Sequence, residues 1–117
     1  MLVSRDWQTR ALLRAQLLEE GCSVRAYESL SDAIPAFERA PFRPSLLVVE
    51  LSGDEPPSAI EQLSTLAARL PVWVLASHSD VGEAALKGRG FETVLFRPID
   101  ISDLVKRVKH RLRKLRE

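Results

Sequence analysis

The sequence predicts a doubly wound α/β domain, in which one five-stranded parallel sheet lies between two layers of helices. Five short apolar runs alternate with longer stretches of helical period, and no internal repeat interrupts this order. The central runs, 46–51 and 72–76, are apolar almost throughout, which is typical of parallel strands covered on both faces. Right-handed crossovers then place helices on both sides of the sheet. With 117 residues, we expect a single domain, 1–117.

Local signals mark each expected element. The strands are expected at residues 2–3, 22–24, 46–51, 72–76 and 93–96. Asp6 can cap the first helix and Gly21 can end it, since these residue types are common at those helix positions. Its inward leucines are expected to be Leu12, Leu13 and Leu17. The second helix should begin near residues 31–32, because Pro35 is tolerated only about the first turn.

The later helices are also marked by their apolar periodicity. The third is expected over about 58–70 and the fourth over about 81–87. The inward residues of the third are Ile60, Leu63, Leu66 and Ala67. The last helix should span about 100–115, with Asp100 and Asp103 as a capping pair. Its apolar stripe is Leu104, Val105, Val108, Leu112 and Leu115.

Composition restricts the class of protein. The chain is 45% hydrophobic and 28% charged, and no apolar run approaches the roughly eighteen residues of a membrane span. Its start does not look like a secretory signal, and the lone Cys22 cannot form an internal disulfide, so we expect a cytoplasmic protein. The net charge is +1, but seven of seventeen basic residues fall in the last dozen positions. They are Lys106, Arg107, Lys109, Arg111, Arg113, Lys114 and Arg116.

The candidate site residues are those at the carboxyl ends of the expected strands. In a doubly wound sheet, ligands bind beside these ends, where the strand order reverses. The residues there are Ser4, Arg5 and Asp6, then Glu50, then Ala76 and Ser77, and finally Arg97 and Pro98. Glu50 is the most unusual of them, because a carboxylate at the end of so apolar a run contributes nothing to a hydrophobic core.

Four segments resemble the receiver domains of two-component response regulators, which are CheY-like proteins. They are LLEEG (17–21), PSLLVVEL (44–51), LPVWVLAS (70–77) and VLFRPIDISDLVKRV (94–108). The resemblance extends over about residues 1–112, and the order and spacing of all five strand ends agree with the family. It implies a flavodoxin-like sheet with strand order 2-1-3-4-5.

The expected phosphorylation pocket departs from the family's pattern. Active members have two adjacent acids for Mg²⁺, an aspartate as phosphoryl acceptor, a Thr or Ser, and a Lys before a proline. The matching positions here hold Ser4 and Arg5, Glu50, Ala76, and Arg97 before the retained Pro98. Asp6 keeps the acidic type of its position, whereas Val94 stands where many active members have Tyr or Phe.

These departures predict a degenerate pseudo-receiver. If Glu50 and Asp6 face Arg5 and Arg97, the charge near the pocket is about zero, and few oxygen ligands remain for a cation. Phosphoryl transfer to such a domain depends on the metal. We therefore expect that Mg²⁺ binding is lost, that no cofactor is held, and that the protein is not an enzyme.

Three interpretations of Glu50 remain. In the favoured one, Arg97, Arg5 or both pair with it and fix one conformation without phosphorylation; a carboxylate imitates a phosphoryl group only partly. In the second, Glu50 is a solvated relict. In the third, Glu50 or another acid still accepts a phosphoryl group. A catalytic pair of Ser77 and His78 is disfavoured, because no third group orients it.

The cationic last helix predicts either a solvated outer face or a contact surface. In many receivers the fourth helix, fifth strand and fifth helix form the dimer or effector interface, so the resemblance favours contact with a protein partner or a second copy. The interface candidates are Lys87, Lys106, Arg107, Lys109, His110 and Arg113. Nucleic-acid binding is the less favoured alternative, since aromatic residues that stack on bases are absent there.

The function predicted is therefore a phosphorylation-independent interaction or dimerisation module in bacterial signal transduction or transcription regulation. Its last helix could lead into an output domain. The acidic, proline-containing loop 52–59 is expected to form either a partner surface or only the rim of the crevice.

Overall fold

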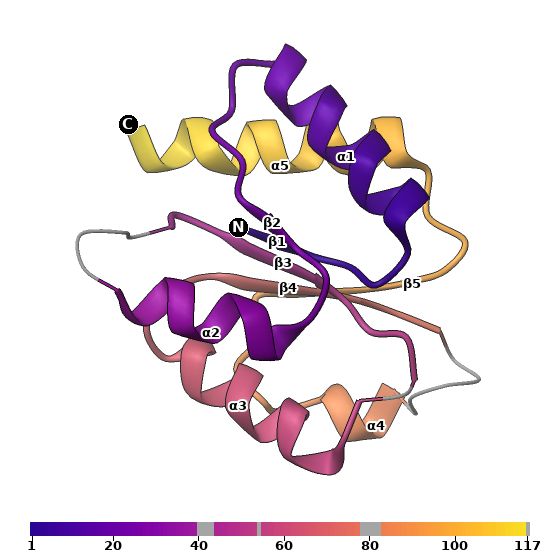
Figure 1. Ribbon diagram of the computed structural model, residues 1–117, viewed down its shortest axis with the longest axis vertical. Helices are drawn as coiled ribbons and strands as arrows, with labels where there is room; N and C mark the ends of the chain where they lie inside the picture. Colours follow the sequence, from indigo (N-terminus) through magenta and orange to yellow (C-terminus); the bar gives the residue numbers. More distant parts are fainter. Residues whose placement is uncertain (40–43, 54, 78–82, 117) are drawn as a thin grey trace.

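Five parallel strands form one sheet in the order β2-β1-β3-β4-β5 in the computed structural model, which describes residues 1–39, 44–53, 55–77 and 83–116 (Figure 1). The strands are β1 (Leu2–Val3), β2 (Ala26–Tyr27), β3 (Leu47–Glu50), β4 (Val72–Ala76) and β5 (Thr93–Phe96). The helices are α1 (Trp7–Glu19), α2 (Leu30–Glu38), α3 (Pro57–Ala67), α4 (Glu83–Leu86) and α5 (Ile101–Arg116). The predicted fold class and strand order are confirmed. Within the described residues, four helices exceed two turns and α4 is a single turn.

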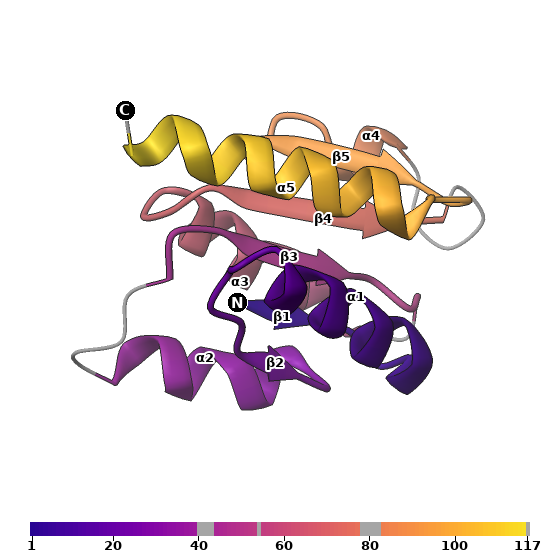
Figure 2. The ribbon, with the colours of Figure 1, turned by 90° about the horizontal axis from the view of Figure 1, so that it is seen from above.

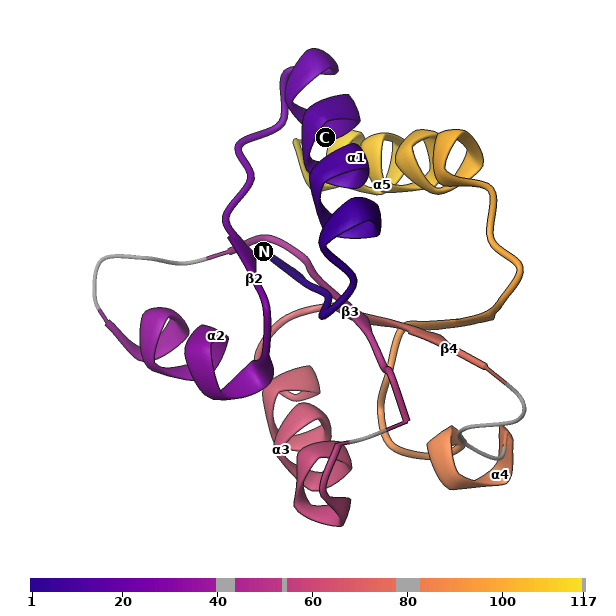
Figure 3. The ribbon, with the colours of Figure 1, turned by 45° about the vertical axis from the view of Figure 1, so that its right-hand side comes forward.

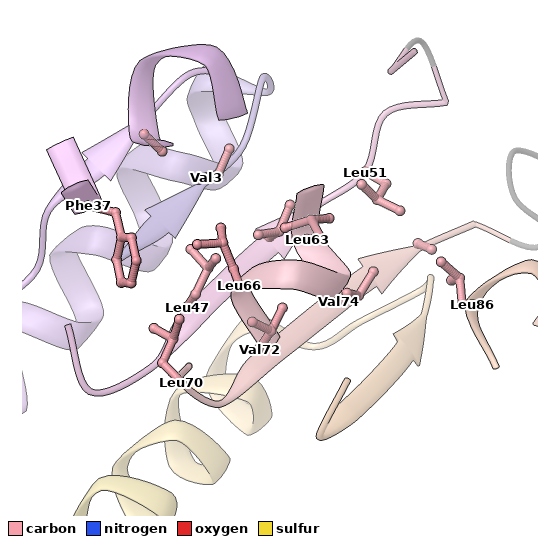
Figure 4. Close-up of a cluster of buried hydrophobic side chains, with 13 residues drawn as sticks. Val3, Phe37, Leu47, Leu51, Leu63, Leu66, Leu70, Val72, Val74 and Leu86 are labelled. Carbon is pink, nitrogen blue, oxygen red and sulfur yellow. The ribbon is translucent and has the colours of Figure 1, made fainter. Parts of the chain in front are cut away.

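Two helical layers cover the sheet. Helices α1 and α5 lie side by side on one face (Figure 2), whereas α2, α3 and α4 follow one another on the opposite face (Figure 3). Successive strand residues point to opposite faces, so Val48 packs toward α1 and α5 while Val49 packs toward α2 and α3. The core between the sheet and helices α2 and α3 is shown in Figure 4. The fully apolar central strands follow from this double coverage.

Helix α1 begins and ends as predicted. Asp6 caps it through a hydrogen bond from the backbone N–H of Gln8, and Gly21 follows it with φ of 85°. Leu13 and Leu17 are buried, but the prediction for Leu12 was wrong, because 49% of its side chain is exposed. Successive side chains of an α-helix point about 100° apart, so Leu12 does not lie on the face that carries Leu13 and Leu17.

Strand β2 lies later in the chain than predicted. Residues 22–24 were expected to form it, but the N–H of Cys22 donates to the carbonyl of Leu17 and still belongs to the end of α1. The first hydrogen bond to the sheet is donated by Leu2 N–H to the carbonyl of Arg25. The half-buried Cys22 packs against the core beneath α1 and α5.

Helix α2, in contrast, begins earlier than predicted. Ser29 caps it, and Pro35 lies at its sixth position rather than in its first turn. A proline there removes one backbone hydrogen bond and crowds the preceding turn. The helix continues past it to Glu38, and its Ala33 and Phe37 are both buried in the core. The burial of Ala33 and Phe37 outweighs the preference of proline for the first turn of a helix, on which the sequence prediction relied.

The remaining helices agree closely with the predicted ranges. Helix α3 ends at Ala67, and its Leu63 and Leu66 are buried while Ile60 and Ala67 are partly buried. In α5 the carboxylate of Asp100 accepts a hydrogen bond from the N–H of Asp103. The predicted start of the fourth helix at Val81 lies outside the described residues. No helix in the described ranges has the length and apolar character needed to cross a membrane.

Candidate functional site

Ser4 and Glu50 meet at the carboxyl ends of the neighbouring strands β1 and β3. Val3 of β1 is in register with Val49 of β3, so the residues that follow them are neighbours. The hydroxyl of Ser4 donates a hydrogen bond of 2.7 Å to Glu50 Oε1. Ser4 is fully buried, and Glu50 is only 9% exposed. The Ser4 hydroxyl therefore holds the Glu50 carboxylate at the carboxyl end of β3. The sequence prediction had not assigned this neutral donor to Glu50.

Arg97 approaches the second oxygen of the same carboxylate. Its Nη1 lies 3.5 Å from Glu50 Oε2, and its Nη2 donates a 2.7 Å hydrogen bond to the carbonyl of Leu51. The backbone N–H of Arg97 donates to the carbonyl of Ala76 at 2.8 Å. One residue thus joins the ends of β3, β4 and β5. The geometry has the Arg97–Glu50 pair that the favoured interpretation of Glu50 requires.

Asp6 does not point to this pair. Its carboxylate accepts hydrogen bonds from Thr9 Oγ1 at 2.8 Å and from Gln8 N–H at 3.0 Å, both within the first turn of α1. These two bonds, that of Thr9 first, lower the pKa of Asp6 from its usual value. The expectation that Asp6 and Glu50 face the same arginines was wrong for Asp6, because capping the helix occupies its carboxylate.

The other predicted pocket residues lie around the same edge. Arg5 is exposed and lines a cavity that Glu50 also lines. Ala76 is fully buried as the last residue of β4, and its methyl group offers no hydrogen bond to a ligand. Pro98 lines a separate shallow hollow beside the start of α5. His78 of the disfavoured Ser77–His78 pair lies outside the described residues.

The arrangement around Glu50 limits its chemistry. One carboxylate oxygen accepts a hydrogen bond from Ser4 and the other faces a guanidinium, so both are engaged within the fold. In the described part of the chain, no three Asp, Glu, His or Cys side chains converge in a way that could hold a metal ion. The contact between Ser4 and Glu50 could have been predicted from the sequence, because Ser4 directly follows a strand expected to lie beside the strand that ends in Glu50.

Two of the basic residues of α5 are engaged inside the molecule. Lys109, an interface candidate, pairs with Glu20 at the end of α1. Arg111 donates two hydrogen bonds of 2.8 Å to Glu92, which also accepts one of 2.7 Å from the buried Trp73 indole. These contacts attach α5 to the rest of the domain.

Basic residues of α5, Arg111 among them, line an open surface, which we call the cationic groove. Its lining residues are Lys106, Arg107, His110, Arg111, Lys114 and, at its base, Trp73. The guanidinium of Arg107 lies 6.0 Å from the centre of a Trp73 ring. Arg113 is exposed nearby on α5, whereas Lys87 follows α4 on the other face of the sheet (Figure 1). The groove thus gathers three of the predicted interface residues.

Stability in acid is expected to depend on Glu92. Hydrogen bonds from Arg111 and then Trp73 lower the pKa of Glu92 despite partial burial, which raises it. A lowered folded-state pKa contributes stability above the ordinary glutamate pKa, and this contribution is lost as pH falls through the folded-state value. From about pH 6 to about pH 3, the free energy of unfolding should therefore fall less in Glu92→Gln than in the natural chain.

Urea denaturation at each pH measures this difference, with Glu61→Gln on an exposed position of α3 as the control. Equal acid sensitivity of Glu92→Gln and the natural chain would contradict the prediction.

The fold is similar to solved receiver domains. A CheY-like receiver domain protein from Methanospirillum hungatei JF-1 matches with a TM-score of 0.76 and 14% identity, over 97% of this chain and 91% of that one. The receiver domain of a putative Luxo repressor protein from Vibrio parahaemolyticus gives 0.75 and 22%, over 97% and 88%. The receiver domain of NtrX from Brucella abortus gives 0.72 and 20%, over 94% and 93%.

No protein-family model matches the sequence, and no curated protein matches it. At identities of 14–22%, the likeness to the solved structures concerns the arrangement of the backbone. Together with the sheet order β2-β1-β3-β4-β5, it shows that this chain has the fold of a response-regulator receiver domain.

Proposed function

We propose that the protein is a pseudo-receiver: a receiver-like domain that works as an interaction module in bacterial signalling or transcription regulation without being phosphorylated. The observation that carries this proposal is the state of Glu50 at the position of the phosphoacceptor. Ser4 and Arg97 hold its two oxygens, so the carboxylate is a fixed structural group of the sheet edge. A nucleophile would have to break these contacts before it could attack phosphorus.

The neighbouring residues support the same proposal. Ser4 and Arg5 stand where the resemblance places the acid pair, and Asp6 is bound to its own helix. Hard oxygen ligands with excess negative charge are what Mg²⁺ needs, and transfer of a phosphoryl group needs that ion to bridge the reacting oxygens. On this proposal the domain binds neither Mg²⁺ nor another cofactor, is not an enzyme, and keeps one conformation.

Beryllofluoride with Mg²⁺ is therefore expected to leave the domain unchanged. The measurement is a titration followed by amide NMR shifts at residues 50, 76 and 97, repeated with acetyl phosphate and Mg²⁺. A phosphorylatable receiver in the same buffer shows that the reagents are active. Saturable shifts at these three amides would support phosphorylation of Glu50 or another acid and would overturn the pseudo-receiver.

The cationic groove supports an acidic protein surface as the partner. Five of its six lining side chains are basic, and Glu92 neutralises one of them, Arg111. Two copies that met through this groove would bring like charges together, which costs free energy. An acidic partner would gain from the same charges, so we favour it over a homodimer and over nucleic acid.

A further inference from the structure

A cavity of about 430 Å³ lies between α2 and α3 and is distinct from the cationic groove. Its apolar lining comes from the strand ends and from both helices, and includes Val3, Val49, Ile34 and Ala59. Val3, Val49 and Ala59 belong to the buried core, so the cavity reaches into the domain. A packed core normally leaves few spaces much larger than a water molecule.

The cavity lies at the place where doubly wound sheets bind ligands. The chain passes from β1 outward to β2 and then returns to β3 on the other side of β1, so the strand order reverses between β1 and β3. Val3 and Leu51 line the cavity beside the carboxyl ends of these two strands. Ligands of this fold class occupy the crevice at that position. The volume also falls within the usual range of about 300–1,000 Å³ for small-molecule sites.

The charged residues around the cavity indicate the charge of a ligand. Glu28, Glu50, Glu55 and Arg5 line it, and Glu50 is paired with Arg97, so two further carboxylates stand against one arginine. Glu55 remains ionised: burial alone raises its pKa, but hydrogen bonds from Ser52 and Gly53 hold that pKa below its usual value. Glu28 is exposed. The excess of carboxylates favours a cation over an anion.

We propose that this cavity binds a small organic amine, whose apolar body enters between α2 and α3 and whose ammonium group stays near Glu28 and Glu55. Glu50 lies on the wall of this cavity, but the proposal requires no phosphorylation of Glu50 and so goes beyond the function proposed above. Beryllofluoride tests that function and the amine tests this site, so either one can fail alone.

Phenethylamine is a suitable probe, with 2-phenylethanol and phenylacetate as partners of nearly the same apolar body. In a titration followed by amide NMR, the amine should give saturable shifts in residues that line the cavity. The alcohol should bind more weakly, and the carboxylate weakest of the three. Glu28→Gln should weaken amine binding about two- to fivefold, as expected for an exposed ion pair, and should leave binding of the alcohol unchanged.

Ala59→Phe, which fills the cavity from α3, should abolish binding of both the amine and the alcohol. Ala15→Phe makes the same change on the exposed side of α1 and should leave binding intact. If Ala59→Phe does not fold, the ranking of the three probes and the effect of Glu28→Gln still decide the question. Absence of saturable shifts with phenethylamine, or equal binding of amine and carboxylate, would overturn the proposal.

Discussion

Replacing Ser4 with alanine is expected to lower the free energy of unfolding by about 1.5–3 kcal/mol, the usual contribution of a hydrogen bond to a charged group. The Ser4 hydroxyl is fully buried and donates to a carboxylate that is 9% exposed. Water cannot easily replace the lost donor, so the carboxylate of Glu50 is left with one partner fewer. Urea denaturation measures the change, and Ser45→Ala at an exposed position is the matched control.

Two further variants test whether the loss comes from Glu50. In a Glu50→Leu background the cost of Ser4→Ala should largely disappear, since no carboxylate remains to be satisfied. Arg97→Ala should cost less than Ser4→Ala, about 1 kcal/mol or below, because Arg97 is 36% exposed and its Nη1 lies 3.5 Å from the carboxylate. If Ser4→Ala is as mild as Ser45→Ala, the hydroxyl does not support Glu50.

Leu63→Ala is expected to cost about 2–5 kcal/mol, the range for removing a fully buried leucine side chain. Leu63 lies on α3 in the core of Figure 4, close to side chains of β3 and β4, and none of its surface is exposed. The cavity left behind adds to the lost transfer free energy, because the rigid sheet beneath cannot collapse fully. Chemical denaturation of the purified domain measures the loss.

Leu18→Ala on α1 is the matched control, since it removes the same atoms from a side chain that is 42% exposed. That change should stay within about 0.5 kcal/mol of the natural chain. Equal effects of the two substitutions would mean that α3 does not pack on the sheet as described.

The strands with strong local signals could be predicted. Strands β4 and β5 occupy the predicted residues, since runs such as VWVLA are apolar throughout and are bounded by a proline and a serine. The position of the edge strand β2 could not be predicted. Strand β2 is only two residues long and half-buried, so its sequence carries no alternation that separates it from the loop before it. The position of Pro35 depends on burial of Phe37, which is a tertiary effect.

The candidate site was predictable as a set of positions but not as a set of contacts. Strand ends predict which residues share an edge, and this placed Glu50 and Arg97 together. They do not predict how side chains turn, so Asp6 was expected at the pocket although it caps α1. The same limit applies to α5. Charge and the resemblance to receivers made Lys109 an interface candidate, whereas Glu20, 89 residues away in sequence, pairs with it.

The short edge strand β2 has a consequence for how the domain opens. Two residue pairs join β1 to β2, whereas four join β3 to β4 and four join β4 to β5. Regions joined by few hydrogen bonds can separate at a free energy below that of global unfolding. Amide hydrogens of β2 and α2 should therefore exchange with solvent before those of β3 and β4. Because α2 is one wall of the cavity, a part of the domain that we expect to open early is also a part through which a small molecule would enter.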